Sequence, residues 1–91
     1  IIDTSADLAL ILSIISSFRN KPIPRNIVVF GEVGLSGEIR PVSSGQERLK
    51  EAVKHGFTRA IVPIANAPKK SIPGLKVIGV KKIFEALQAL F

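Results

Sequence analysis

A serine close to the start of the chain, Ser5, carries the hydroxyl best suited to nucleophilic chemistry. A serine hydroxyl attacks a substrate only when a base, commonly histidine or lysine, lies within hydrogen-bond reach. The single histidine, His55, follows the end of a predicted helix, and we expect it to be structural or exposed. From the local sequence, Ser5 is predicted to cap a helix, with Asp3 or Thr4 as alternative caps. A nucleophilic Ser5 is the competing hypothesis.

Two carboxylates, Glu32 and Glu38, could act as an acid–base pair. A tight turn at Ser36-Gly37 would not place them directly opposite each other, and each has basic residues near it in the sequence. We therefore predict surface or ion-paired carboxylates rather than a catalytic pair.

Three glycines, Gly31, Gly34 and Gly37, invite comparison with phosphate-binding loops. Their spacing matches neither the dinucleotide fingerprint nor the P-loop, and a strand follows where those motifs need a helix N-terminus. We interpret them as hairpin glycines, so this segment is not expected to hydrolyse ATP by itself.

The composition is that of a small, apolar chain. Its 91 residues suffice for one domain or part of one, and 46% of them are hydrophobic, with a mean hydropathy of +0.35. The chain opens in an apolar segment without an initiator methionine, so we expect a fragment whose missing part, or partner subunits, covers apolar surface. Because the chain has no cysteine and one histidine, neither a thiolate nor a histidine-rich metal site is expected.

The chain is also basic, with 13 Lys and Arg against 7 Asp and Glu and a formal net charge of +6. Such a charge is typical of an ordinary solvated surface or of nucleic-acid contact, and both interpretations stay open at this point. The apolar run Leu8–Phe18 is too short to span a bilayer, and it lacks the features of a signal peptide. We therefore expect a cytoplasmic protein without membrane contact.

The apolar pattern predicts a first helix over about residues 5–19, which ends at a proline-containing segment. Its apolar stripe is broad enough that we expect the helix to be enclosed on most sides. The stripe consists of Leu8, Ile11, Leu12, Ile15 and Phe18, widened by Leu10 and Ile14. A central hairpin is predicted over residues 27–42, with one strand at 27–30, a turn at Ser36-Gly37 and an edge strand at 38–42.

A capping box over Ser44–Glu47 predicts that a second helix covers about residues 45–55 and ends at Gly56. The residues of this helix expected to face inward are Leu49, Ala52 and Val53. The remaining predicted elements are strands at about 59–64 and 76–80 and a terminal helix at about 82–90. A helix between two strands offers a crossover, so part of the sheet should be parallel. We predict an α/β (α+β) fold in which a mixed sheet packs with helices in two layers.

Four stretches of the sequence carry a family resemblance. They are DTSADLAL at 3–10, SSFRNKPIP at 16–24, VVFGEVGLSGEIRPVSSGQERLKEAVKHGF at 28–57 and RAIVPIANAPKK at 59–70. Almost the whole chain thereby resembles the C-terminal domain of the bacterial RadA (Sms) family of DNA repair proteins, which is in turn similar to the proteolytic domain of Lon. The resemblance implies a ribosomal-protein-S5-domain-2-like fold, in which residues 1–91 form a single, partial Lon-like domain that lacks its N-terminal strands.

The resemblance also implies that the peptidase chemistry of Lon is lost. Ser5 falls where Lon has its nucleophilic serine, but Gln46 occupies the position of the catalytic lysine. Phe30 replaces a threonine that supports this lysine, and Asp7 replaces the glycine that follows Ser-Ala. A glutamine amide cannot accept the serine proton at neutral pH, and Lys50 lies one helical turn away, about 5–6 Å along the axis. The domain is therefore expected to be non-catalytic, with Ser5 and Gln46 forming a degenerate site.

RadA-like proteins join a zinc finger, a RecA-type ATPase core and the Lon-like domain in a hexameric ring that acts on branched DNA. By this resemblance, the full-length protein is an ATP-dependent DNA translocase or helicase whose ATP, Mg and Zn sites lie outside the present segment. The segment itself would serve as an oligomerisation scaffold and would bind DNA through phosphates, with no cofactor or small-molecule substrate of its own.

Nine of the 13 basic residues of the chain are the candidate phosphate contacts in this hypothesis. They are Arg19, Lys21, Arg25, Arg40, Arg48, Lys50, Lys54, Lys69 and Lys70. Two alternatives stay open: a Lon-like serine peptidase with Ser5 as nucleophile, and a protein-interaction module without nucleic-acid contact.

Overall fold

A computed structural model describes residues 6–91 of the chain. This part contains three α-helices, one 3-10 helix (η1) and two three-stranded sheets. In chain order the elements are β1 (Ala6–Asp7), α1 (Leu8–Arg19), β2 (Ile27–Val29), β3 (Glu32–Val33), β4 (Ile39–Arg40), α2 (Gly45–Lys54), β5 (Arg59–Pro63), η1 (Ile64–Asn66), β6 (Lys76–Val80) and α3 (Ile83–Leu90).

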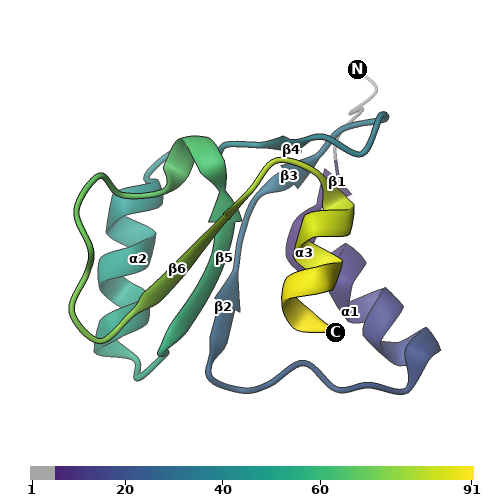
Figure 1. The fold of residues 1–91 in the computed structure, drawn as a ribbon, viewed down its shortest axis with the longest axis horizontal. Helices are drawn as coiled ribbons and strands as arrows, with labels where there is room; N and C mark the ends of the chain where they lie inside the picture. The colour runs from purple at the N-terminus through teal and green to yellow at the C-terminus, as the bar shows by residue number, and fades with distance from the viewer. Residues whose placement is uncertain (1–5) are drawn as a thin grey trace.

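The larger sheet is parallel and has the strand order β2-β5-β6. Ile27 pairs with Arg59 and Arg59 with Lys76, so the three strands begin at the same end of the sheet. Helix α2 lies on one side of this sheet, and α1 and α3 lie on the other (Figure 1). The predicted mixed α/β class and the predicted parallel pairing are confirmed. The prediction of one mixed sheet in two layers is wrong, because helices cover both faces of the parallel sheet and the antiparallel strands form a second sheet.

The central strand β5 supplies apolar side chains to both faces of the larger sheet. Ile61 is buried together with Leu12 of α1, whereas Ala60 and Val62 are buried together with Leu49 of α2. This division follows from the strand geometry, in which successive side chains point to opposite faces. Each face therefore has its own apolar core, and the sheet is the layer that the two cores share.

The smaller sheet is antiparallel and has the order β1-β3-β4. The predicted hairpin over 27–42 is wrong in its first strand, because β2 pairs with β5 while the shorter β3 pairs with β4. The chain changes sheets at Gly31, whose φ of 142° is rarely adopted by residues with a side chain. A Cβ atom at Gly31 would also lie 3.1 Å from Cγ of Pro63. The predicted turn at Ser36-Gly37 does lie between β3 and β4.

Helix α1 begins at Leu8 and not near residue 5. Asp7 is its N-cap, and the Asp7 carboxylate accepts a hydrogen bond from the backbone N–H of Leu10 at 3.2 Å. The predicted caps Asp3, Thr4 and Ser5 lie outside the described residues. At the other end Asn20 has the left-handed conformation, with a φ of 57°, and its backbone N–H donates to the carbonyl of Ser17 at 3.3 Å.

Only one face of α1 is enclosed, which contradicts the prediction of a helix buried on most sides. Leu8 and Leu12 are fully buried, but Leu10 and Ile14 are about half exposed and Phe18 is 88% exposed. The exposed side chains follow one another at intervals of four residues, so they form a stripe on the side of α1 that points away from the sheet.

Helix α2 begins without the predicted capping box. Ser44 is at the N-cap position but has a left-handed φ of 60°, and its side chain makes no capping hydrogen bond. A capping serine normally has an extended backbone, which aims its hydroxyl at the N–H groups of the first turn. The end of α2 is as predicted to within a residue: the helix ends at Lys54, and Gly56 follows with a φ of 85°.

We expect substitutions at Ser44 to behave unlike those at a bonded N-cap. Ser44→Ala should lower the free energy of unfolding by less than about 0.5 kcal/mol, compared with about 1 kcal/mol for a serine that caps through its side chain. Ser44→Gly should leave stability unchanged or raise it by up to about 1 kcal/mol, since glycine adopts positive φ without strain. Urea unfolding of the two variants measures both values. A loss of about 1 kcal/mol or more for Ser44→Ala would contradict this expectation and support the predicted capping box.

Two of the three side chains expected to face inward from α2 do so. Leu49 and Ala52 are buried, whereas Val53 is 37% exposed, so its assignment to the core is wrong. Each residue of a helix is rotated by about 100° from its predecessor, so a residue directly after a buried one lies on the flank. Helix α3 begins at Ile83, where the Glu85 carboxylate accepts hydrogen bonds from the backbone N–H groups of Lys81 and Lys82 at 3.0 and 2.9 Å.

Candidate functional site

Gln46, which the sequence predicts to belong to a degenerate catalytic site, lies at the N-terminus of α2. Gln46 is exposed in the first turn, and its side-chain amide donates to the backbone carbonyl of Asn66 at 3.3 Å. Phe30 is 6% exposed and lies beneath the Arg48 guanidinium, 5.6 Å from the ring centroid. Lys50 is exposed, one turn beyond Gln46 on α2. Ser5 lies outside the described residues, so its distance to these side chains is not defined.

Asn66 holds the chain in place just before α2. Its side-chain oxygen accepts from the backbone N–H of Val42 at 2.8 Å, and its side-chain amide donates to the Val42 carbonyl at 3.0 Å. This pair of bonds imitates the pairing of a β-strand with a neighbour. A Cβ atom at Gly45 would lie 2.6 Å from the Asn66 amide nitrogen, so the first position of α2 fits only glycine without movement. The polar side chains here therefore position backbone, and Gln46 contributes to the same contact.

A cleft of about 240 Å³ lies next to this position. Asp7, Glu32 and Arg48 supply its charged lining, and Gly31 contributes backbone. The Asp7 carboxylate is engaged as the cap of α1, and the Arg48 guanidinium lies over the Phe30 ring. Glu32 pairs with Asp7 in β1-β3 and with Arg40 in β3-β4. Glu32 and Glu38, considered above as an acid–base pair, do not face each other across the hairpin, as predicted.

Basic side chains gather where the three parallel strands begin. The row of backbone bonds at this end joins the strands: the N–H of Thr58 donates to Asn26 O at 3.0 Å, and the N–H of Lys76 to Thr58 O at 2.9 Å. Arg25 precedes Asn26, Arg59 follows Thr58, and the Lys76 side chain is exposed. We call this region the basic end and define it by Arg19, Lys21, Arg25, Arg59 and Lys76.

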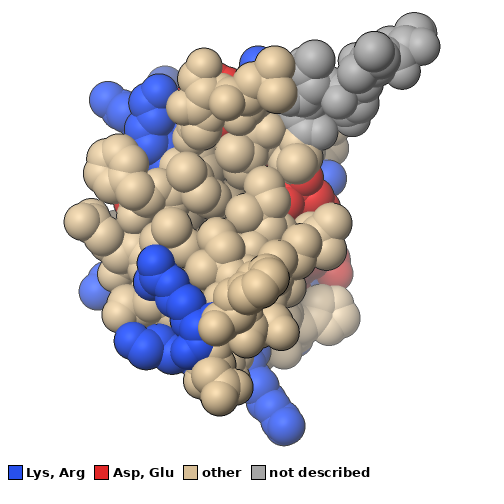
Figure 2. Space-filling view, turned by 90° about the vertical axis from the view of Figure 1, so that its right-hand side faces the viewer, with Lys and Arg blue, Asp and Glu red and all other residues tan. Residues whose placement is uncertain are grey.

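Two arginines of the basic end are held by the C-terminus of α3. The Arg59 guanidinium donates to the carbonyl of Ala89 at 3.3 Å, and the Arg19 guanidinium lies 5.7 Å from the centre of the Phe91 ring. The last carbonyls of a helix carry partial negative charge, which favours cations at this position. Lys21, Arg25 and Lys76 are exposed. Figure 2 shows blue side chains toward the lower end of the face that carries α1 and α3, and a second blue group at its upper left.

The described acidic residues lie elsewhere in the fold. Asp7, Glu32 and Glu38 belong to the smaller sheet and its turn, Glu85 to the start of α3, and Glu47 and Glu51 to α2. The positive charge of the basic end is therefore left largely uncompensated by its own strands and loops. Such a concentration of one charge sign raises the local concentration of an anionic partner.

The structure separates the predicted phosphate contacts into two groups. Arg19, Lys21 and Arg25 lie together at the basic end, and Lys54 lies near it at the last turn of α2. Outside this end are Arg40, Arg48, Lys50, Lys69 and Lys70.

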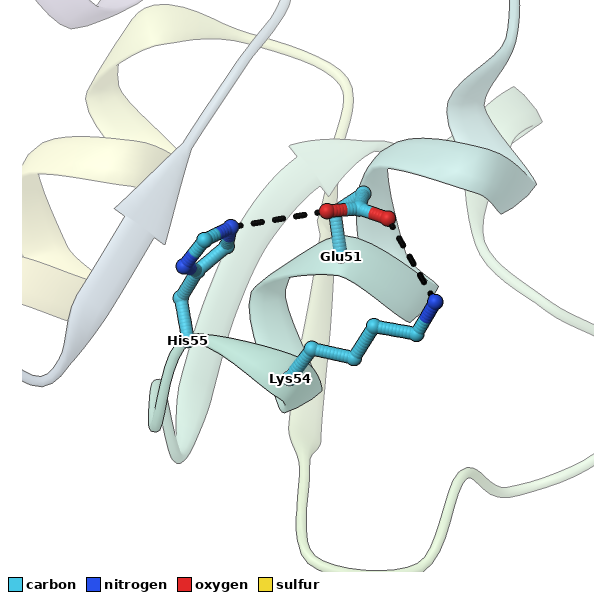
Figure 3. Close-up of polar contacts among 3 residues, drawn as sticks. All are labelled: Glu51, Lys54 and His55. Carbon is cyan, nitrogen blue, oxygen red and sulfur yellow. Dashed lines mark ion pairs between the residues drawn. The ribbon is translucent and has the colours of Figure 1, made fainter.

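Ion pairs reduce the charge that two of these side chains present. Arg40 lies 3.6 Å from the Glu38 carboxylate. Lys54 lies 3.6 Å from the Glu51 carboxylate, which also contacts His55 at 3.4 Å (Figure 3). Exposed pairs of this kind are worth little to stability, about 0–1 kcal/mol, but they lower the net charge available to a ligand.

Sequence reasoning missed Arg59 and Lys76 as members of the basic end. Each is the first residue of a parallel strand, and each was placed at the start of a predicted strand. Because parallel strands begin at the same end of a sheet, a basic residue at successive strand starts is a signal that could have found them.

Within residues 6–91, no group of three or more His, Cys, Asp or Glu side chains is placed to hold a metal ion. None of the helices in the described part of the chain is long and apolar enough to cross a membrane.

The fold and the site thus define a small mixed α/β domain with a basic end. The chain belongs to the family described as subunit ChlI of Mg-chelatase, whose family model matches residues 3–66. It is 62% identical over 91 residues to the DNA repair protein RadA of Pseudomonas aeruginosa, 65% over 85 residues to that of Escherichia coli and 44% over 89 residues to that of Aquifex aeolicus. These matches cover 100%, 93% and 98% of the chain, but 20%, 18% and 20% of the relatives.

The chain therefore spans about a fifth of the length of the curated relatives it matches. The likeness to RadA predicted from the sequence is confirmed. The placement of the chain as the C-terminal, Lon-like part of such a protein stays a prediction.

Proposed function

We propose that this chain is a non-catalytic oligomerisation scaffold and DNA-binding domain within a RadA-like, ATP-dependent DNA repair protein. The observation that carries the proposal is the basic end, which brings together cations from the end of α1, from the segment before β2 and from the first residues of β5 and β6. The name of the relatives, DNA repair protein RadA, supports DNA as the partner. In this proposal the segment is the Lon-like, S5-domain-2-like C-terminal part of a cytoplasmic protein, and any ATP, Mg and Zn sites lie outside it.

The chemistry of the basic end suits contact with phosphates rather than with bases. Exposed Lys21, Arg25 and Lys76 offer donors and charge to phosphate oxygens, and such contacts position a protein on a duplex without reading its sequence. Arg19 and Arg59 contact the end of α3. They would contribute to the positive electrostatic potential more than to direct contact with phosphates. We therefore expect DNA binding that depends on shape and charge and shows little sequence preference.

The same geometry gives no support to the peptidase alternative. The Gln46 amide is engaged with the Asn66 backbone and cannot take a proton from a serine at neutral pH. Lys50 is exposed to solvent one turn away on α2. The proposed function consequently depends on the charge of the surface and not on peptidase chemistry.

The proposal is tested by the salt dependence of duplex binding. Each phosphate contact releases condensed counterions, so the logarithm of the binding constant falls with the logarithm of salt concentration by about 0.9 for each contact. With three to five contacts from the basic end we expect a slope of about −3 to −4.5. Fluorescence anisotropy with a labelled duplex between low and moderate salt measures it. A flat response, or no binding at low salt, contradicts the DNA-binding role.

A further inference from the structure

The loop that joins η1 to β6 forms a pocket with the start of that strand. The loop lies on the side of the molecule away from α1 and α3 (Figure 1). Among the described strands of the parallel sheet, β6 is the edge strand opposite to β2. The pocket has a volume of about 320 Å³. We call it the loop pocket, and its lining includes Pro68, Lys69, Ser71, Ile72, Leu75 and Lys76.

The polar lining of the loop pocket carries only positive charge. Lys69 and Lys76 supply ammonium groups and Ser71 supplies a hydroxyl, and all three residues are exposed. Their side chains make no hydrogen bond or ion pair with another residue of the described part of the chain. The sequence contains no acidic residue between Glu51 and Glu85. Two ammonium charges in one hollow without a carboxylate favour an anionic ligand.

The backbone of the same loop adds further donors. Among the described residues, the N–H groups of Lys69, Lys70 and Ser71 donate to no backbone carbonyl. The later part of the loop is closed by its own hydrogen bond, from the N–H of Leu75 to the carbonyl of Ile72 at 3.1 Å. Ammonium, hydroxyl and amide groups all donate to oxyanions, and such bonds are stronger when one partner is charged. A phosphate, with its several acceptor oxygens, uses many such donors at once.

The remaining wall of the loop pocket is apolar. Leu75 is 7% exposed and belongs to the core between α2 and the parallel sheet, and Ile72 packs against the same core. Pro68 is partly buried. Small-molecule sites typically combine apolar walls with a few polar groups, and their volumes begin at about 300 Å³. The loop pocket therefore suits a small ligand that carries an apolar ring beside its anionic group.

A phosphate monoester matches these donors better than a phosphate within a duplex. A monoester carries a charge of about −1.5 to −2 at pH 7, which two ammonium groups neutralise. Each phosphate within a DNA strand carries one negative charge, and a duplex presents these charges along an extended, rigid backbone. An extended backbone fits the open surface of the basic end, whereas a hollow admits a single terminal group.

We infer that the loop pocket binds a phosphate monoester joined to an apolar ring. The phosphate lies at Lys69, Ser71 and Lys76, and the ring lies against Pro68 and Leu75. A free mononucleotide and the 5′ end of a DNA strand both present this chemistry. Because Lys76 also belongs to the basic end, a bound monoester neutralises one cation that the proposed function assigns to duplex DNA. Only this coupling rests on the proposed function, and the binding itself does not.

Lysine acetylation of the intact protein, read by mass spectrometry, tests the inference at each residue. Adenosine 5′-monophosphate is the probe, and adenosine and inorganic phosphate are the controls. At saturation, the monophosphate should slow the acetylation of Lys69 and Lys76 severalfold and leave Lys54 unchanged. Adenosine should protect neither residue. Inorganic phosphate should need a concentration on the order of tenfold higher, because it lacks the ring.

Three results of this experiment would overturn the inference. The first is equal protection by adenosine, which would show that the phosphate is not recognised. The second is equal half-saturation by inorganic phosphate and the monophosphate, which would indicate an adventitious ion only. The third is a lack of reaction at Lys69 and Lys76 before any probe is added, which would show that the rest of the intact protein covers the pocket.

Neighbouring lysines provide a matched pair of substitutions. Lys69→Gln and Lys70→Gln remove the same charge from adjacent exposed positions, but only Lys69 lines the loop pocket. Lys69→Gln should raise the half-saturating concentration of the monophosphate, measured at Lys76, on the order of tenfold. Lys70→Gln should raise it by less than about twofold. Equal effects would overturn the inference, because they would mean that the ligand responds only to net charge.

A short single strand with and without a 5′ phosphate distinguishes the two sources of the ligand. If the phosphorylated strand protects Lys69 and Lys76 at lower concentration than the monophosphate does, the ligand is a DNA end. If the monophosphate is the stronger of the two, the ligand is a free nucleotide. Equal protection by both strands would contradict the inference, because the phosphates within a strand would then suffice.

Duplex binding in the presence of the monophosphate tests the coupling through Lys76. At 0.1 M salt the saturating ligand should weaken duplex binding by up to about eightfold, the contribution of one phosphate contact. Lys76→Gln should abolish this effect. If the duplex binds and the monophosphate protects neither Lys69 nor Lys76, the inference is wrong while the proposed function stands. If the monophosphate protects both lysines and no duplex binds, the DNA-binding function is wrong while the pocket stands.

Discussion

Neutralising three exposed cations of the basic end should lower the affinity for duplex DNA on the order of a hundredfold or more at 0.1 M salt. The variant is Lys21→Gln, Arg25→Gln and Lys76→Gln, which leaves Arg19 and Arg59 to bind the end of α3. Counterion release makes each phosphate contact worth about eightfold in the binding constant at 0.1 M salt. The slope of the salt dependence should become shallower by up to about 2.7 in the same variant.

A second variant with the same loss of charge provides the control. Lys50→Gln, Lys69→Gln and Lys70→Gln remove three exposed cations that lie outside the basic end. If binding responded only to the net charge of the chain, the two triple variants would lose the same affinity. Equal losses would therefore contradict the assignment of DNA to the basic end, whereas a much smaller loss in the control supports it.

Replacing Leu49 by alanine should lower the free energy of unfolding by about 2–5 kcal/mol. Leu49 is fully buried between α2 and the parallel sheet, where it packs in the core that also contains Ala60 and Val62. Truncation removes transfer free energy and leaves a cavity that the layer fills only in part, because the central strand β5 is fixed by its pairing with β2 and β6. Chemical unfolding followed by circular dichroism measures the loss.

Val53→Ala is the matched control on the same helix. Val53 lies one turn beyond Leu49 and is 37% exposed, so its truncation should lower the free energy of unfolding by less than about 1 kcal/mol. The sequence pattern alone places both side chains in the core. Similar losses of unfolding free energy for the two variants would mean that Val53 is buried as Leu49 is, and would contradict its exposure in the structure.

Local signals in the sequence predict those parts of the fold that depend on neighbouring residues. The run 59–63 reads as a buried strand because β-branched and apolar residues follow one another, and Gly56 reads as the end of a helix. The helix before the strand at 59–63 predicts that part of the sheet is parallel, as observed, although the strand directly before this helix, β4, belongs to the other sheet. None of these inferences needs the position of a distant residue.

The failed predictions share a dependence on distant residues. The run 27–33 looks like one hairpin strand, and only the approach of Pro63 to Gly31 shows why the chain changes sheets there. Ser44 matches a capping box in sequence, but the bonds between Val42 and Asn66 fix the approach to α2 and accompany a left-handed Ser44.

The candidate site could be predicted in part. The sequence predicts Arg19, Lys21 and Arg25 as candidate contacts because they are basic. Arg59 and Lys76 join them only through strand register, which the composition does not contain. The exposed Phe18 was expected in the core because its spacing continues the stripe of α1, and spacing cannot show where a core ends.

The central claim is that DNA lies against the start of the parallel strands, and lysine footprinting tests it within a single sample. The protein is acetylated with and without duplex DNA at low salt, and mass spectrometry measures the modification of each lysine. We predict that DNA protects Lys21 and Lys76, while Lys50 and Lys69, which are also exposed in the free chain, react as before. Protection of Lys50 and Lys69 with free reaction of Lys21 and Lys76 would contradict the account.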